Sequence, residues 1–355
     1  MKPDTEEKIA TRWEDYISAP QTRGTPATCR TACAAAFEPV RRIIKQVIAA
    51  QRPATIAVLG AGVLNDIPFG DLVQSGSDIH FVDWIPGIVD TGLTQSCIDH
   101  DDTGKPRCVF CTLGPEQAPA WCRRFAVTPS ESSGVCRNFE PVDQATPACK
   151  AYERGTRPVV HCNDVTGGYA SAFARHWFET VKSADSWRQA IKQAGRAARR
   201  TRHDGAPIEI ADGSVDLVTS SMLLSQFAYE PYLYLSKQVA AKLGPPSAQE
   251  DRQLAKPLAA LLEMLTVNQI ECHLDEVERI MAPDGRLFVA FEMFHYEPES
   301  GANILVGEMH RALEILGHRF DFDFDLLPAR DSVVETRAHG EPSVVHAFLL
   351  RRRTG

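Results

Sequence analysis

Ile56-Ala-Val-Leu-Gly60-Ala-Gly62-Val-Leu-Asn65 is an apolar run that enters a Gly-x-Gly turn. A second apolar run, Ile79-His-Phe-Val-Asp83, ends in an acid 21 residues after Gly62. In doubly wound α/β proteins, a strand, a glycine turn and a second strand with a terminal acid bind the adenosine part of a cofactor. These two runs therefore predict an α/β fold with an adenosine-cofactor site.

The turn departs from the dinucleotide fingerprint at the third glycine position, which Asn65 occupies. A pyrophosphate at a helix N-terminus needs free amides and no nearby anion. Asp66 adds a negative charge here, and Pro68 has no N–H to donate. A phosphate-free cofactor is therefore favoured, and an NAD-dependent oxidoreductase is the alternative.

Three later segments extend this pattern. Residues 159–166 are typical of a strand that ends in an acid, Asp164. Residues 212–227 are typical of a further strand that runs into a cleft, and residues 279–291 of a helix end, a Pro-Asp-Gly turn and another strand. Together with the glycine turn, these segments resemble the class I, Rossmann-like S-adenosylmethionine-dependent methyltransferases.

The resemblance implies a doubly wound, mostly parallel seven-stranded sheet with helices on both faces, and S-adenosylmethionine as the cofactor. It implies close backbone approach at the two glycines, an acid on the ribose hydroxyls after the second strand, and an acid on the adenine edge after the third. The cofactor-binding residues expected on this basis are Gly60, Ala61, Gly62, Asp83, Trp84, Asp164, Val165 and Ser220.

The acceptor is less visible in the sequence. After the fourth expected strand the chain has Ser220-Ser-Met-Leu-Leu-Ser-Gln226 where many methyltransferases of bases or glutamine have Asn/Asp-Pro-Pro-Tyr. This difference favours a small-molecule acceptor. His295 and Glu292, just past the fifth expected strand, are the candidate catalytic residues, because a histidine that titrates near neutral pH suits general-base work. A lone histidine is also commonly structural.

Bulk composition bounds the class of protein. The chain has 355 residues, 44% of them hydrophobic, and no apolar run long enough to cross a bilayer. Its polar N-terminal residues lack a secretory signal, so a cytoplasmic location and no membrane partner are expected. The net charge of −8 disfavours nucleic acid as a partner, and the basic run at 188–202 is interpreted as a solvated helix face. The oligomeric state is left open.

Helical spacing is present at residues 4–18 and 37–51, ahead of the first strand, and helices are also expected at 229–243 and 303–317. The stretch 84–157 is rich in Pro, Gly, Ser and Cys, and is much longer than an ordinary connection. The expected organisation is an N-terminal helical segment at 1–52, a Rossmann-like domain at 53–95 and 155–355, and a Cys-rich insertion at 96–154.

The insertion carries a candidate metal site. Cys108-x2-Cys111 is a chelating pair, and Cys97 and Cys122 flank it with ten intervening residues on either side. Four thiolates bind zinc or an iron–sulfur cluster, whereas buried or free thiols are the competing interpretation. Some ribosomal RNA methyltransferases have a cysteine cluster that ends in Trp-Cys, as Trp121-Cys122 does here, so a related protein with a metal site is a further alternative. The last alternative is a metal- or cofactor-sensing protein that has no catalytic activity.

Overall fold

The computed structural model describes residues 36–62, 64–85, 88–89, 158–181, 183–201, 207–297, 302–305, 309–336 and 342–353. The predicted helix at 4–18 and the insertion at 96–154 lie outside the described residues. The four candidate metal ligands Cys97, Cys108, Cys111 and Cys122 lie outside them too.

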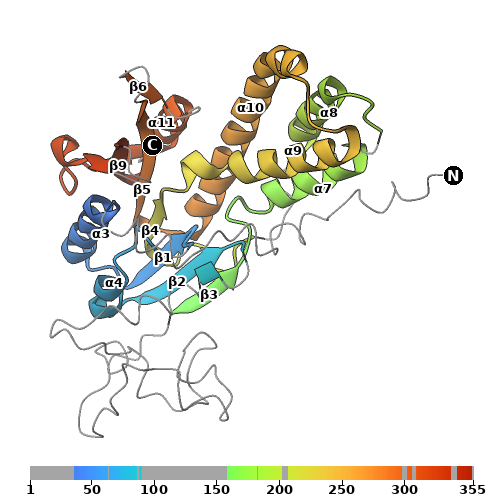
Figure 1. Ribbon diagram of the computed structural model, residues 1–355. Helices are drawn as coiled ribbons and strands as arrows, with labels where there is room; N and C mark the ends of the chain where they lie inside the picture. Colours follow the sequence, from blue (N-terminus) through green and yellow to red (C-terminus); the bar gives the residue numbers. More distant parts are fainter. Residues whose placement is uncertain are drawn as a thin grey trace, which may run out of the picture.

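The centre of the protein is one twisted sheet (Figure 1). Its strands are β1 Thr55–Leu59, β2 Asp78–Asp83, β3 Val159–Cys162, β4 Val215–Ser221, β5 Met281–Glu297, β6 Ala302–Leu305, β7 Phe320–Phe322, β8 Val333–Thr336 and β9 Ser343–Arg352. The order along the sheet is β3-β2-β1-β4-β5-β9-β7, with β1 to β5 parallel and β9 antiparallel to β5. This is the Rossmann-like arrangement that the resemblance implies.

The described sheet has nine strands, two more than expected. The additional strands are β6, which pairs with the extended end of β5, and β8, which pairs with β9. Each has four residues, and its place in the sheet depends on pairing with a strand that is distant in the sequence or follows a turn. A helix was expected over 303–317. The chain instead forms β6 and then begins helix α11 at Met309.

Helices cover both faces of the sheet. They are α3 Glu38–Gln51, α4 Phe69–Ser75, α7 Tyr169–Val181, α8 Trp187–Arg200, α9 Tyr229–Leu243, α10 Ala248–Ile280 and α11 Met309–Arg319. Alternate residues of β1 point to opposite faces: Ile56 and Val58 join the core under α3 and α4, whereas Ala57 and Leu59 join the core under α10 and α11. The doubly wound arrangement is therefore confirmed.

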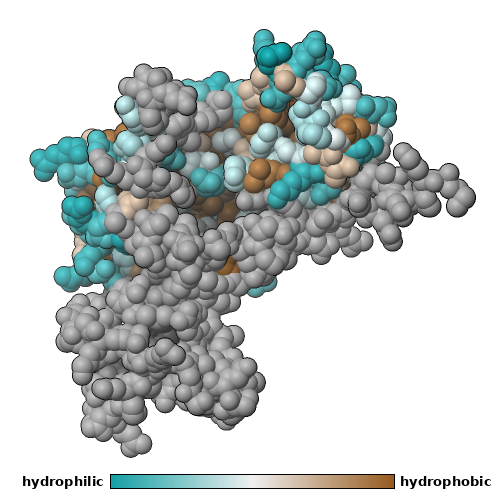
Figure 2. Space-filling model, viewed as in Figure 1, coloured by the Kyte–Doolittle hydropathy of each residue, from teal (hydrophilic) through white to brown (hydrophobic). Residues whose placement is uncertain are grey.

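A helical lobe stands at one end of the sheet, made by α7, α8, α9 and the first half of α10 (Figure 1). Its core is built around Trp177 and Tyr234, whose rings meet edge to face with centroids 6.2 Å apart. Hydrophobic patches lie on this lobe between its hydrophilic ends (Figure 2). The 33 residues of α10 extend about 50 Å and connect this lobe to the sheet. A capping box of Ser247 and Glu250 fixes the start of α10.

No helix in the described part of the chain combines the length and the apolar character needed to cross a bilayer.

Candidate functional site

A cavity of about 230 Å³ lies at the carboxyl ends of β1, β2 and β4. The strand order reverses between β1 and β4, and open α/β sheets bind ligands at such a switch point. The residues that line the cavity are Gly60, Gly62, Asp83, Trp84, Ile85, Ile88, Val165, Thr166, Leu223, Gln226, Phe227, Tyr229 and Gln269. Five of the eight predicted cofactor residues are thus brought together here: Gly60, Gly62, Asp83, Trp84 and Val165.

The amides of the glycine turn are already used within the protein. Gly60 and Ala61 donate their N–H groups to the carbonyl oxygen of Val82, at 2.8 and 3.2 Å. Gly62 donates its N–H to Oδ2 of Asp83 at 2.9 Å. The turn therefore presents bare backbone to the cavity but keeps its donors for the end of β2.

Glycine is required at position 60 for two reasons. The φ angle of Gly60 is +68°, a conformation that other residues adopt at a cost. A Cβ placed on Gly60 would also lie 2.6 Å from Cδ1 of Leu223. Leu223 reaches this position because Met222, at φ +54°, turns the chain sharply at the end of β4. The glycine turn and the end of β4 are therefore packed in direct contact.

Asp83 places a carboxylate in the cavity wall. The residue is buried, and its Oδ1 accepts a hydrogen bond of 2.9 Å from the amide of Ile85. Burial raises the pKa of Asp83 above its usual value, and the amides of Ile85 and Gly62 oppose this rise. Each carboxylate oxygen retains accepting capacity beyond these bonds. Of the described residues around the cavity none is Lys, Arg or His, so its wall suits a ligand that offers hydrogen-bond donors or positive charge.

Asp66 follows the glycine turn and is not part of the cavity lining. Burial raises the pKa of Asp66 to about 6, and the nearby Ser221 hydroxyl and Arg41 oppose the rise. The acid is therefore mostly ionised at pH 7, and it provides no attraction for a phosphate.

The carboxylate of Asp164, after β3, is held by the loop that follows it and by the first turn of α7. Oδ1 accepts from the amide and the hydroxyl of Thr166, and Oδ2 accepts from the amide and the hydroxyl of Ser171 at 3.0 and 2.9 Å. Asp164 is not part of the cavity lining, although the adjacent Val165 and Thr166 are. Its predicted role at the adenine edge stays a prediction, and these four bonds count against it.

Ser220 is buried behind the cavity and bonds to a histidine that was not singled out from the sequence. His273 Nδ1 lies 2.8 Å from the carbonyl oxygen of Val165, so Nδ1 carries the proton and donates it. Nε2 then accepts from the Ser220 hydroxyl at 3.0 Å. Burial lowers the pKa of His273 to about 4, which keeps the ring neutral. Ser220 and His273 join β4 to the end of β3, and Ser220 is not in the lining.

The two catalytic candidates lie on β5. Glu292 pairs in register with Val345 of β9, and the backbone of His295 pairs with Ser343. Glu292 is not part of the cavity lining. Both roles stay predictions.

Within the described ranges, no group of three or more His, Cys, Asp or Glu side chains is placed to hold a metal ion. The zinc or iron–sulfur site predicted from the insertion therefore has no support here, and its ligands lie outside these ranges.

Gln269 and Phe227 are cavity residues that sequence reasoning did not assign. Phe227 closes the segment identified as the fourth strand, and its ring packs edge to face on His273, with centroids 5.2 Å apart. Gln269 comes from α10, about fifty residues after β4 ends, and no local pattern marks it.

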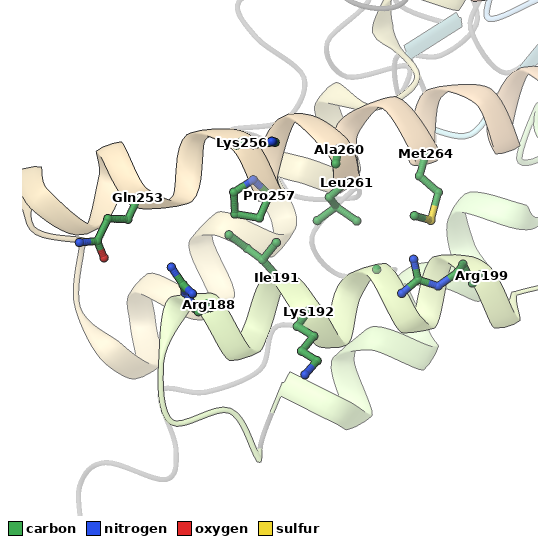
Figure 3. A pocket seen from close by; sticks show the side chains of 11 residues that line it. Arg188, Ile191, Lys192, Arg199, Gln253, Lys256, Pro257, Ala260, Leu261 and Met264 are labelled. Atoms are coloured by element: carbon green, nitrogen blue, oxygen red, sulfur yellow. The ribbon is translucent and has the colours of Figure 1, made fainter.

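A groove of about 460 Å³ lies between α8 and α10 (Figure 3). Its floor is apolar, with Ile191, Pro257 and Leu261 facing one another between the two helices (Figure 3). Basic side chains also line it: Arg188, Lys192, Arg199 and Lys256. Three of these belong to the run interpreted as a solvated helix face, so part of that run faces this groove.

The chain is similar to solved methyltransferase structures at low identity. A TehB-like SAM-dependent methyltransferase from Corynebacterium glutamicum shares 12% identity with a TM-score of 0.30, over 89% of this chain and 88% of that one. A SAM-dependent methyltransferase from Aquifex aeolicus shares 10% identity with a TM-score of 0.36, over 92% of this chain and 98% of that one. Magnesium protoporphyrin IX methyltransferase from Synechocystis, solved with bound SAM, shares 10% identity with a TM-score of 0.33, over 96% of this chain and 85% of that one. No protein-family model and no curated protein matches the chain.

Proposed function

We propose that this chain is an S-adenosylmethionine-dependent methyltransferase that acts on a small molecule. The observation that carries the proposal is the chemistry of the cavity wall. There the Asp83 carboxylate lies beside a glycine turn in which the amides of Gly60, Ala61 and Gly62 are engaged. Such a wall suits a nucleoside with hydroxyl donors and a positive charge, and it does not suit a phosphate.

The residues present fit the cofactor in three respects. Gly60 brings bare backbone to the cavity wall beside Leu223, where no Cβ fits, and Asp83 retains capacity to accept from ribose hydroxyls. Trp84, Val165 and Phe227 provide apolar contacts for a flat base. When bound, S-adenosylmethionine supplies an electrophilic methyl group, and the chain's part is to hold and align the reactants in a shielded site.

The same wall counts against the NAD alternative. A pyrophosphate would find no unused amide at Gly60, Ala61 or Gly62, and it would face the Asp83 carboxylate. In the dinucleotide folds that bind such a group, amides at the helix N-terminus point at the phosphates.

The proposal of a small-molecule acceptor is supported by the Ser220–Gln226 segment, which lacks the Asn/Asp-Pro-Pro-Tyr run. Tyr229, exposed at the rim of the cavity, gives an aromatic surface for such an acceptor. His295 and Glu292 remain our candidates for proton removal.

Calorimetric titration of the full chain tests the cofactor. S-adenosylmethionine and S-adenosylhomocysteine should bind, and NAD should not. The Asp83→Asn variant should bind at least about tenfold more weakly, because its side chain has one accepting oxygen where the carboxylate has two. Asp331→Asn, which changes an exposed acid outside the cavity, should bind as the wild type does. Absence of binding by both adenosyl compounds would falsify the proposal.

A further inference from the structure

The groove between α8 and α10 is long and lies apart from the cavity at the sheet, with which it shares no lining residue. The two helices run in the same direction beside it, with Arg188 and Gln253 at one end and Arg199 and Met264 at the other (Figure 3). The lining covers residues 188 to 199 of one helix and 253 to 264 of the other, about 16 Å along each axis. The groove is therefore as long as about three turns of helix.

The charge of this groove is opposite to that of the whole chain, which carries a net charge of −8. Among the described residues the lining contains no Asp or Glu, and it contains four basic side chains: Arg188, Lys192, Arg199 and Lys256. None of the four forms an ion pair or a hydrogen bond with any residue that the structure describes. Charges of one sign gathered in a hollow repel one another and attract a ligand of the opposite sign. The groove therefore suits an anionic occupant.

The floor of the groove offers apolar surface with open space above it. Ile191 and Leu261 are buried in the floor, and Pro257 is exposed beside them. Gly195 also belongs to the lining. Outside its chain neighbours and the backbone of α8, a Cβ built there would meet one atom within 4 Å, Nη2 of Arg199 at 3.9 Å. Packing within the lobe thus does not require this glycine, which costs stability in mid-helix, and its bare backbone lets an occupant approach α8 closely.

The distribution of the four cations indicates an elongated occupant. They are spread along and across the groove and do not converge on one point (Figure 3). A single phosphate or carboxylate would pair with only part of this set. A flat lipid surface would rest on the exposed basic side chains and leave the buried Ile191 and Leu261 without contact. A nucleic acid would find no aromatic side chain in the lining on which to stack a base.

We propose that this groove docks an acidic amphipathic helix of a partner protein, about three turns long. Such a helix presents apolar side chains at i, i+4 and i+7, which fit the floor over Gly195, and acids on both flanks, which pair with the four cations. It has the length, the charge and the apolar stripe that the groove requires. The inference does not rest on the proposed function, because no residue of the cavity takes part in it.

Fluorescence anisotropy on the full chain tests the proposal with a labelled synthetic peptide of about four turns, held helical by a lactam bridge. The peptide carries leucine along one stripe and glutamate on both flanks. It should bind, and its dissociation constant should rise with ionic strength because the charged pairs are screened. A peptide with glutamine in place of glutamate, and another with serine in place of leucine, should each bind at least about tenfold more weakly.

Two variants locate the binding in the groove. Gly195→Leu fills the space above the floor and should abolish binding, whereas its melting temperature should equal or exceed that of the wild type because leucine favours helix. Arg199→Glu should weaken binding about threefold to tenfold. Its matched control is Arg196→Glu, the same change on the same helix outside the lining, which should alter the dissociation constant by about twofold or less. If Gly195→Leu does not fold, the two arginine variants still decide.

Several results would overturn the inference. They are failure of the acidic peptide to bind, equal binding to wild type and folded Gly195→Leu, or equal effects of the two arginine variants. Vesicles of phosphatidylglycerol or single-stranded DNA that bind in the place of the peptide, with loss in Arg199→Glu, would assign the groove to a lipid surface or a nucleic acid instead. A wild-type dimer that Gly195→Leu converts to monomer in sedimentation would assign the groove to contact between copies. None of these results bears on the binding of S-adenosylmethionine.

Discussion

Replacing Gly60 by alanine should be far more damaging than replacing another glycine of nearly the same backbone conformation. Gly60 has φ +68° and Gly213, in the turn before β4, has φ +64°. An alanine at either position adopts a left-handed conformation that costs about 1 kcal/mol. At Gly213 a Cβ meets nothing within 4 Å, whereas at Gly60 it meets Leu223 Cδ1 at 2.6 Å.

The expected magnitudes follow from this difference. Gly213→Ala should lower the free energy of unfolding by about 1 kcal/mol, which is the backbone cost alone. Gly60→Ala carries the same backbone cost and adds about 1–3 kcal/mol for overpacking. Leu223 can relieve the clash only by moving within the cavity wall, so nucleoside binding should fall as well.

Urea unfolding and S-adenosylhomocysteine calorimetry on four variants measure these effects. Leu223→Ala removes the opposing side chain, so in that background Gly60→Ala should cost only about 1 kcal/mol, like Gly213→Ala. If Gly60→Ala proves too unstable to isolate, the double variant with Leu223→Ala still tests the clash. Equal losses for the two single glycine variants, or an excess that persists without Leu223, would refute this reasoning.

Two further predictions concern stability. Lowering the pH from 7 to 5 should cost about 2 kcal/mol through His273, because its pKa is about 4 when folded and 6.5 when unfolded, so only the unfolded chain takes up the proton. The slope of unfolding free energy against pH should be shallower in His273→Gln, and an unchanged slope would count against a neutral buried ring. Lys256→Gln should stabilise the protein by about 0.5 kcal/mol at low ionic strength by relieving repulsion from Arg188, Lys192 and Arg199. Urea midpoints that differ equally at low and high salt would contradict that explanation.

The parts of the fold that the sequence predicts are those specified by local pattern. Ile56–Leu59 and Ile79–Val82 are short apolar runs bounded by turn signals, and both form buried parallel strands. Tyr229–Leu243 forms the predicted helix with the predicted bounds. Strand β6 was predicted as helix because its identity depends on pairing with the end of β5, which no local pattern contains.

The site residues that could be predicted were likewise those fixed by local sequence pattern. Gly60, Gly62 and Asp83 lie next to one another because strand ends and turns fix them. Asp164 shows the limit, because an acid at a strand end can face a ligand or bond to its own loop. Here the hydroxyls of Thr166 and Ser171 donate hydrogen bonds to the Asp164 carboxylate. Gln269 could not be found in this way, since its place depends on the path of a long helix across the molecule.

The continuity of α10 connects the helical lobe to the cavity at the carboxyl ends of β1, β2 and β4. Leu261 and Leu265 are anchored in the lobe, Ile270 and Leu274 are anchored against the sheet, and Gln269 lies on the turn between them. Because both halves of α10 are packed in this way, we expect the lobe and the cavity to unfold together in hydrogen exchange. Excising the lobe should therefore loosen the stretch of α10 that carries Gln269 at the cavity.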